Sequence, residues 1–80
     1  MTKPNQNELA ETVKKTLSSY LAQLGDETAG DVYGMVIRHV ERAMLETVLE
    51  HAGGNQTKAA AMLGISRNTL RRKLEQYHIL

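Results

Sequence analysis

The chain has 80 residues and a formal net charge of +1 at pH 7. A chain of this length forms one small domain with a limited core, and association with further chains is a common way for such a domain to gain stability. The absence of cysteine excludes disulfide bonds and thiolate metal sites, and it suits a reducing compartment.

The start of the sequence carries no signal for export or membrane insertion. The opening stretch, MTKPNQNELAET, is polar and has no apolar run of the kind found in signal peptides. No segment approaches the roughly 18 consecutive apolar residues of a membrane-spanning helix. We therefore expect a cytoplasmic protein without membrane association, located on the nucleoid if it binds DNA.

Charge is distributed unevenly along the chain. Residues 1–54 carry five basic and eight acidic side chains, a balance of −3, whereas residues 55–80 carry five basic side chains against Glu75 alone, a balance of +4. An isolated basic run is often only a solvated helix face. This run coincides with the motif described below, so the asymmetry favours a polyanionic partner for the C-terminal part.

The first 52 residues predict two long helices after a disordered N-terminal segment, residues 1–7. The first helix spans residues 8–24, where apolar residues recur at steps of three and four, and it ends before Gly25. The turn GDETAG then leads into a second helix over residues 31–51.

The second predicted helix has an apolar face wider than the roughly 100° of an ordinary surface helix, because Tyr33, Ile37 and Met44 extend its main stripe. The chain contains one other long helix that could cover this face. We therefore predict a symmetric homodimer in which residues 8–52 of both subunits, the dimerisation helices, share a four-helix core.

Residues 53–80 predict two short helices, over residues 56–63 and 67–77. Asn55 and Ser66 directly precede these helices, and their side-chain oxygens can cap the free backbone amides of the first turns. The predicted fold class is thus all-α, with four helices per subunit.

Three residues at fixed spacing predict that the two short helices form a helix-turn-helix. Ala60 is small enough to let the helices cross closely, and Gly64 tolerates the left-handed backbone of a tight turn. Leu70 is the apolar anchor of the second helix. Such a motif places its second helix in the major groove of DNA.

A recognition helix offers its first residues to base edges, while flanking groups hold phosphates. Arg67 is the candidate for bidentate contact with guanine O6 and N7, and Asn68 can also reach base edges. The predicted phosphate contacts lie at the opening of the first short helix and along the second: Asn55, Gln56, Thr57, Lys58, Thr69, Arg71, Arg72 and Lys73. One base-reading arginine among many phosphate contacts predicts broad, salt-sensitive binding.

Residues typical of catalytic or metal sites do not form a recognisable pattern. The three histidines lie far apart without metal-ligand spacing, and there is no nucleophile–base pair or glycine-rich phosphate loop. We expect no enzymatic activity, no metal and no cofactor.

The stretch GNQTKAAAMLGISRNTLRRKLEQY resembles the Fis family, the bacterial nucleoid-associated factors for inversion stimulation. The resemblance continues through LAETVKKTLSSYLAQL, DVYGMV and ERAMLETVLEHAGGNQTKAA, and covers residues 9–77. The C-terminal part is also similar to the DNA-binding domain of nitrogen-regulation-type enhancer-binding activators. Their ATPase domain has no counterpart here, which favours a free-standing Fis-like protein.

The resemblance implies an intertwined homodimer whose two recognition helices lie too close together for straight DNA, so that the duplex bends. It aligns the family's DNA-contacting positions with Asn55, Thr57, Lys58, Arg67, Thr69, Arg71, Arg72 and Lys73. Ser66, also in the predicted contact set, stands where the family has asparagine, and Asn68 stands where it has glycine. The family's N-terminal arm, which touches recombinases, is replaced here by residues 1–7, so we expect DNA binding and bending without stimulation of DNA inversion.

The leading prediction is therefore a DNA-bending nucleoid-associated protein with a transcriptional regulatory role. Two alternatives remain: a dedicated sequence-specific regulator of a few promoters, and a dimeric adaptor whose helix-turn-helix docks to protein. A contact with RNA polymerase is left open.

Overall fold

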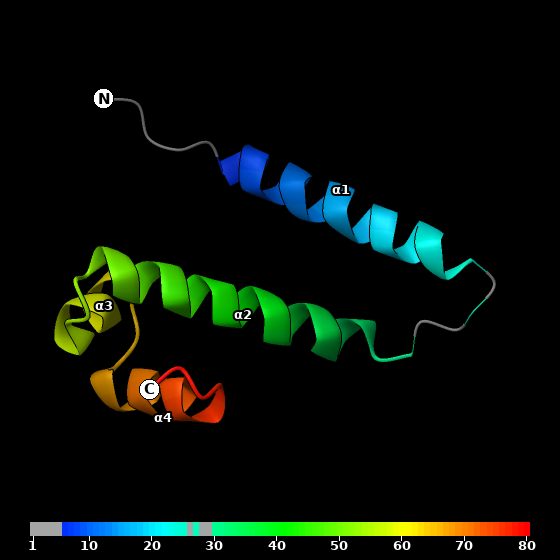
Figure 1. Cartoon of the computed structure of the whole chain (residues 1–80). Coiled ribbons are helices and arrows are strands. Elements are labelled where there is room, and N and C mark those ends of the chain that lie inside the picture. Colours follow the sequence, from blue (N-terminus) through cyan, green and yellow to red (C-terminus); the bar gives the residue numbers. More distant parts are fainter. Residues whose placement is uncertain (1–5, 26, 28–29) are drawn as a thin grey trace. The chain divides into compact units, whose positions relative to one another are not determined.

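The computed structural model describes residues 6–25, 27 and 30–80 of the chain. These residues form four α-helices and no strand, which confirms the expected all-α class (Figure 1). In chain order the helices are α1 (Gln6–Leu24), α2 (Val32–His51), α3 (Gln56–Leu63) and α4 (Arg67–Gln76). The chain divides into two compact units, residues 1–32 and 33–80.

The first unit contains α1, which begins two residues before the expected start at Glu8. It ends at Gly25, whose backbone is left-handed and whose N–H donates to the carbonyl of Ala22 at 3.2 Å. Residues 1–5 of the expected disordered segment lie outside the described residues, as do residues 26, 28 and 29 of the expected acidic turn.

Two consecutive glycines end α2 and redirect the chain into α3. Gly53 and Gly54 have φ values of +66° and +82°, and the N–H of Gly54 donates to the carbonyl of Leu49 at 2.9 Å. A side chain is strained in this region of backbone space, so glycine is the residue that fits the bend.

The core of the second unit lies where the C-terminal half of α2 meets α3 and α4. Its buried residues come from all three helices and from the segments that follow α2 and α4: Leu45, Leu49, Ala52, Ala59, Ala60, Leu70, Leu74 and Tyr77. Val48, Leu63, Ile65 and Ile79 are partly buried against this cluster. The core thus fixes the two short helices against one end of α2.

The N-terminal half of α2 contributes nothing to this core. Tyr33, Ile37 and Val40 are large apolar residues of this half that remain exposed in the single chain, Tyr33 to 78%, and Met44 further along α2 is exposed as well. Among the described residues, no helix combines the length and the apolar character needed to cross a membrane.

Candidate nucleic-acid interface

The segment between α3 and α4 has the geometry of a helix-turn-helix. Gly64 has φ +76°, and its N–H donates to the carbonyl of Ala60 at 2.9 Å. The N–H of Ile65 donates to the same carbonyl at 3.1 Å, which closes the end of α3 in a left-handed cap. The predicted turn at Gly64 is therefore confirmed.

Both short helices begin with the predicted caps. The Asn55 side chain accepts a hydrogen bond from the backbone N–H of Lys58 at 3.1 Å. The Ser66 hydroxyl oxygen accepts from the backbone N–H of Thr69 at 3.1 Å, and the hydroxyl donates to the Thr69 side chain at 2.9 Å. Each cap satisfies an amide that the helix itself leaves unpaired and fixes the residue at which the helix starts.

The two helices cross at the expected residues. Ala60 and Leu70 are buried, as are Leu74 and Tyr77 further along the chain. Because these residues share one side of α4, its polar residues are left on the other side. The burial expected of the anchor residue Leu70 is confirmed.

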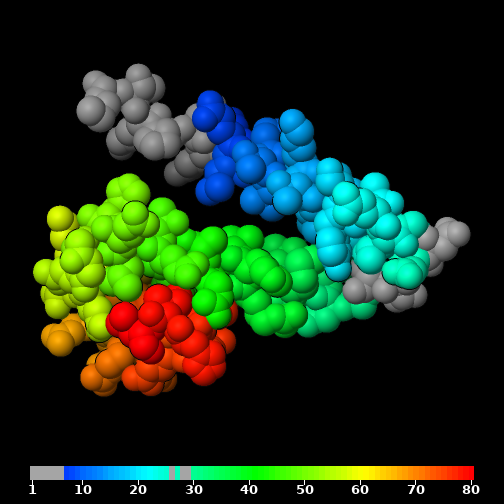
Figure 2. Space-filling view, in the orientation of Figure 1, coloured from blue at the N-terminus to red at the C-terminus, as the bar shows by residue number. Residues whose placement is uncertain are grey.

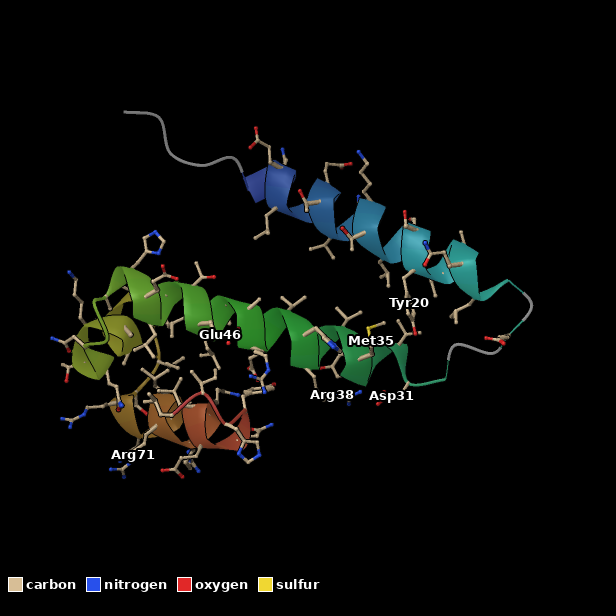
Figure 3. The ribbon with its side chains drawn as sticks, viewed as in Figure 1. Tyr20, Asp31, Met35, Arg38, Glu46 and Arg71 are labelled. Atoms are coloured by element: carbon tan, nitrogen blue, oxygen red, sulfur yellow. The ribbon has the colours of Figure 1, made fainter. Side chains whose placement is uncertain are left out.

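The remaining side of α4 is basic and exposed. Arg67, Asn68, Arg71 and Arg72 are all exposed, and Arg71 projects from the helix on the side away from α2 (Figure 3). The one acidic residue of α4, Glu75, is also exposed and lies in its last turn. Arg67 thus lies in the first turn of α4, where a recognition helix meets base edges, and Arg71 and Arg72 follow in its middle.

The opening of α3 supplies a second group of predicted contacts. Thr57 and Lys58 are exposed there, and Gln56 is half-buried. The first backbone amides of a helix, together with its dipole, attract an anionic group such as phosphate. Thr69 is half-buried beside Ser66, to whose hydroxyl it is hydrogen-bonded.

Lys73 differs from the other predicted contacts, because its ammonium group is bound within the protein. Its Nζ lies 2.9 Å from Oε2 of Glu41 on α2, and a third of its side chain is exposed. An opposite charge at this distance offsets much of the attraction that Lys73 could exert on a phosphate.

Glu41 belongs to a group that sequence reasoning missed, here named the Tyr77 cluster: Glu41, Arg42, Lys73 and Tyr77. The Tyr77 hydroxyl donates to Oε1 of Glu41 at 2.5 Å. Nη2 of Arg42 donates to the backbone carbonyl of Tyr77, and the Arg42 guanidinium lies 5.6 Å from the centroid of the tyrosine ring. The cluster therefore joins the C-terminal end of α4 to the middle of α2.

These contacts shift two titration equilibria. The hydrogen bond from Tyr77 and the contact with Lys73 hold the pKa of Glu41 below its ordinary value, despite some opposing effect of burial. The hydrogen bond to Glu41 raises the pKa of the Tyr77 hydroxyl. Arg42 and Glu41 precede Tyr77 by 35 and 36 residues in the sequence. No motif spacing could therefore have indicated this cluster.

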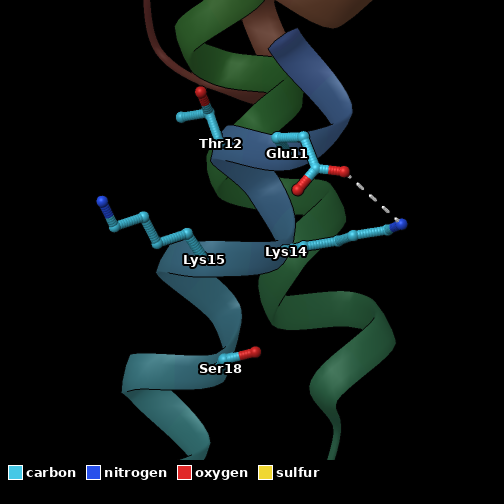
Figure 4. A pocket seen from close by; sticks show the side chains of 5 residues that line it. All are labelled: Glu11, Thr12, Lys14, Lys15 and Ser18. Carbon is cyan, nitrogen blue, oxygen red and sulfur yellow. Dashed lines mark ion pairs between the residues drawn. The ribbon is translucent and has the colours of Figure 1, made fainter. Parts of the chain in front are cut away.

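A separate open pocket lies on α1 (Figure 4). It is lined by Glu11, Thr12, Lys14, Lys15 and Ser18, all from one helix. Its only drawn ion pair, between Lys14 and Glu11, spans 3.9 Å, and both side chains are 74% exposed. Among the described residues, no three His, Cys, Asp or Glu side chains are grouped so that they could hold a metal ion.

Comparison with known proteins places this geometry in a family. The model for the bacterial regulatory proteins of the Fis family matches residues 36–77, which span most of α2 and all of α3 and α4. The protein named DNA-binding protein Fis of Actinobacillus succinogenes is 51% identical over 69 residues, covering 86% of this chain and 70% of that protein. The protein of the same name from Aeromonas hydrophila is 46% identical over 74 residues, covering 92% and 76%.

A Fis-like protein of Pseudomonas aeruginosa is 48% identical over 82 residues, with 100% of this chain and 79% of that protein covered. The matched regions include the caps, the turn and the basic helix described above. The chain therefore belongs to the Fis family of bacterial regulatory proteins.

Proposed function

We propose that this protein is a dimeric, DNA-bending, nucleoid-associated DNA-binding protein with a transcriptional regulatory role and a broad sequence preference. The observation that carries the proposal is the exposed basic side of α4, held on a helix-turn-helix in a chain of the Fis family. The names of its relatives, which describe DNA-binding proteins, support it.

The first turn of α4 supplies the base contacts. Arg67 has the planar pair of donors that fits guanine O6 and N7, and Asn68 lies beside it on the exposed side. Arg71 and Arg72 follow on the same helix and bind phosphates, together with Lys58 at the opening of α3. Because phosphate contacts outnumber base contacts, affinity depends strongly on salt and weakly on sequence.

The dimer is supported by four exposed apolar residues that follow one another along α2. Tyr33, Ile37, Val40 and Met44 would expose a contiguous apolar surface in an isolated subunit, and a second copy of the chain buries it. Residues 8–52 then form the dimerisation helices, and residues 53–80 form the DNA-binding segment. Two basic helices related by the dimer axis contact one duplex, and their spacing bends it.

The dimer has its own test. Ile37→Glu places a charge on the apolar surface and should convert the dimer into a monomer in sedimentation equilibrium, whereas Glu46→Ala, an exposed change on the same helix, should leave the dimer intact. A wild-type protein that is monomeric at micromolar concentration would overturn this part of the proposal.

DNA binding is tested by a gel-shift titration of a random-sequence duplex and an A/T-centred duplex of equal length, at two salt concentrations. We expect affinities within about tenfold of one another, both falling steeply with salt. Arg67→Ala should weaken binding severely. Lys15→Ala, which removes the same charge from an exposed site on α1, is the matched control and should bind nearly as well as the wild type.

The other outcomes of this titration separate the alternatives. Tight binding to one duplex alone would indicate a dedicated regulator. No shift on either duplex would indicate a protein-binding adaptor. The expectations that the protein is not an enzyme, that it lies on the nucleoid and that it does not stimulate DNA inversion stay predictions, and a rise in recombination in an inversion assay would contradict the last.

A further inference from the structure

Tyr77, directly after the last residue of α4, makes most of the polar contacts that attach this end of the helix to α2, and it is only 7% exposed. Three parts of this residue are bound at once. Its hydroxyl donates to Glu41, its backbone carbonyl accepts from Arg42, and its ring lies beside the Arg42 guanidinium. In the space-filling view the C-terminal residues, drawn in red, lie against α2, drawn in green (Figure 2).

Arg42 acts on the end of the helix itself. The carbonyl groups of the last turn of a helix lack partners within the helix and carry the negative end of its dipole. Arg42 reaches from α2 to the carbonyl of Tyr77, so a cation from another helix completes the end of α4 with a charge-assisted hydrogen bond.

Glu41 binds α4 at two points. One carboxylate oxygen accepts from Tyr77 at 2.5 Å, and the other lies 2.9 Å from the ammonium of Lys73. Residues four apart lie on the same side of a helix, so both contacts hold one side of α4 against α2. Two points of attachment fix the rotation of the helix about its own axis as well as its position.

Rotation matters because the basic residues stand on the opposite side of the helix. On a helix of about 6 Å radius, a rotation of about 20° moves a surface group by about 2 Å. A displacement of that size exceeds what a bidentate hydrogen bond from Arg67 tolerates.

We propose that Glu41 and Arg42 are positioning residues for α4, which set the angle and rotation at which its basic side meets DNA without touching the DNA themselves. This inference rests on the proposed DNA-binding function. It assigns a role in recognition to two residues of α2 that lie outside the helix-turn-helix.

The first test compares Glu41→Ala with Glu46→Ala. Both changes remove one negative charge from α2, so both alter long-range attraction to DNA alike, but Glu46 is exposed and lies outside the Tyr77 cluster. Duplex affinity is measured by fluorescence anisotropy at 20 °C, with circular dichroism showing that each variant is folded. We expect Glu41→Ala to bind about tenfold more weakly than Glu46→Ala, the size of one lost base contact.

Tyr77→Phe removes the hydroxyl without changing any charge, and it should weaken binding in the same direction. A role in stability alone would leave the affinity of a fully folded protein unchanged. Equal affinities of Glu41→Ala and Glu46→Ala, with the wild type bound, would overturn the inference alone. A wild type that bound no duplex would overturn the proposed function and this inference with it.

The second test uses Arg42, whose side chain is half-buried against Tyr77. Arg42→Gln should weaken binding, and Arg42→Lys, which keeps a cationic donor, should recover part of the loss. The slope of log affinity against log salt should be unchanged in Arg42→Gln. A slope smaller by about 0.9 would mean that Arg42 itself contacts a phosphate, and that result would overturn its assignment as a positioning residue.

Discussion

The two ends of α4 are stabilised in different ways. The N-terminal end is stabilised by residues next to it in the sequence, whereas the C-terminal end is bound by side chains of α2 that lie 35 and 36 residues from Tyr77. The start depends on the Gly64 turn and the Ser66 cap, both within three residues of the helix. The end depends on Glu41 and Arg42. One end of the recognition helix is thus defined locally, and the other only once α2 has packed against it.

The difference separates two properties of the motif. Local caps determine where α4 starts and which residues face outward, because their hydrogen bonds form within one turn. The distant contacts determine how the finished helix is oriented on the rest of the protein. Mutations at the two ends should therefore have different consequences for stability and for DNA binding.

The largest effect on stability is expected from Leu70→Ala, because Leu70 packs α4 into the core on which both of its ends depend. Leu70 is fully buried in the core cluster, so its truncation should lower the free energy of unfolding by about 2 to 5 kcal/mol through lost burial and a cavity. Chemical denaturation at fixed protein concentration measures this free energy of unfolding. Leu80→Ala, at an exposed position, should change stability by less than about 0.5 kcal/mol, and similar losses in the two variants would contradict the assigned core.

Gly64→Ala should strain the turn that leads into α4 while leaving the contacts of the Tyr77 cluster unchanged. No atom lies within 4 Å of the position that a Cβ would occupy, so the cost comes only from placing alanine at φ +76°. We expect a loss of about 1 to 2 kcal/mol in the free energy of unfolding. Gly64→Asn is the control, because asparagine tolerates this backbone; an equal loss in both variants would show that strain is not the cause.

Ser66→Ala should have a smaller effect at the same end. It leaves the N–H of Thr69 without its side-chain partner, which costs about 1 kcal/mol. Ser66→Asn keeps a capping oxygen and should retain most of the stability in the same denaturation experiment. If alanine proved as stable as asparagine, the cap would contribute nothing measurable.

The contribution of the C-terminal end of α4 to stability should depend on pH. The pKa of Glu41 is lowered in the folded protein, so its ionised form stabilises the fold fully above the ordinary pKa of glutamate, and this contribution is lost as pH falls through the lowered folded value. The pKa of Tyr77 is raised, so its protonated form stabilises the fold below the ordinary pKa of tyrosine, and this contribution is lost at more alkaline pH.

Thermal unfolding midpoints measured against pH should therefore fall less steeply on the acid side in Glu41→Gln than in the wild type. On the alkaline side the midpoints of Tyr77→Phe should likewise fall less steeply with rising pH than those of the wild type. Ser66→Ala, which changes only the local end, should shift the whole curve without changing its shape. Curves of identical shape for the wild type and Glu41→Gln would show that the cluster is not formed in solution.

Much of the fold could be predicted because its signals are local. The bounds of α3 agree with the expected residues 56–63, and α4 ends one residue before the expected end at Tyr77. Caps and a left-handed turn restrict helix ends to within a residue or two. The start of α1 was placed two residues too late, at Glu8 instead of Gln6.

The sequence by itself determined the all-α class, the helix-turn-helix and the basic side of α4, because periodicity, capping and the turn glycine act over a few residues. Only the tertiary structure decided that Lys73 is paired with Glu41 and that Tyr77 is bound by α2. The sequence alone predicts a phosphate contact for Lys73 and no contact between Tyr77 and α2. Contacts between side chains on different helices depend on how those helices pack, and no spacing along the chain encodes that arrangement.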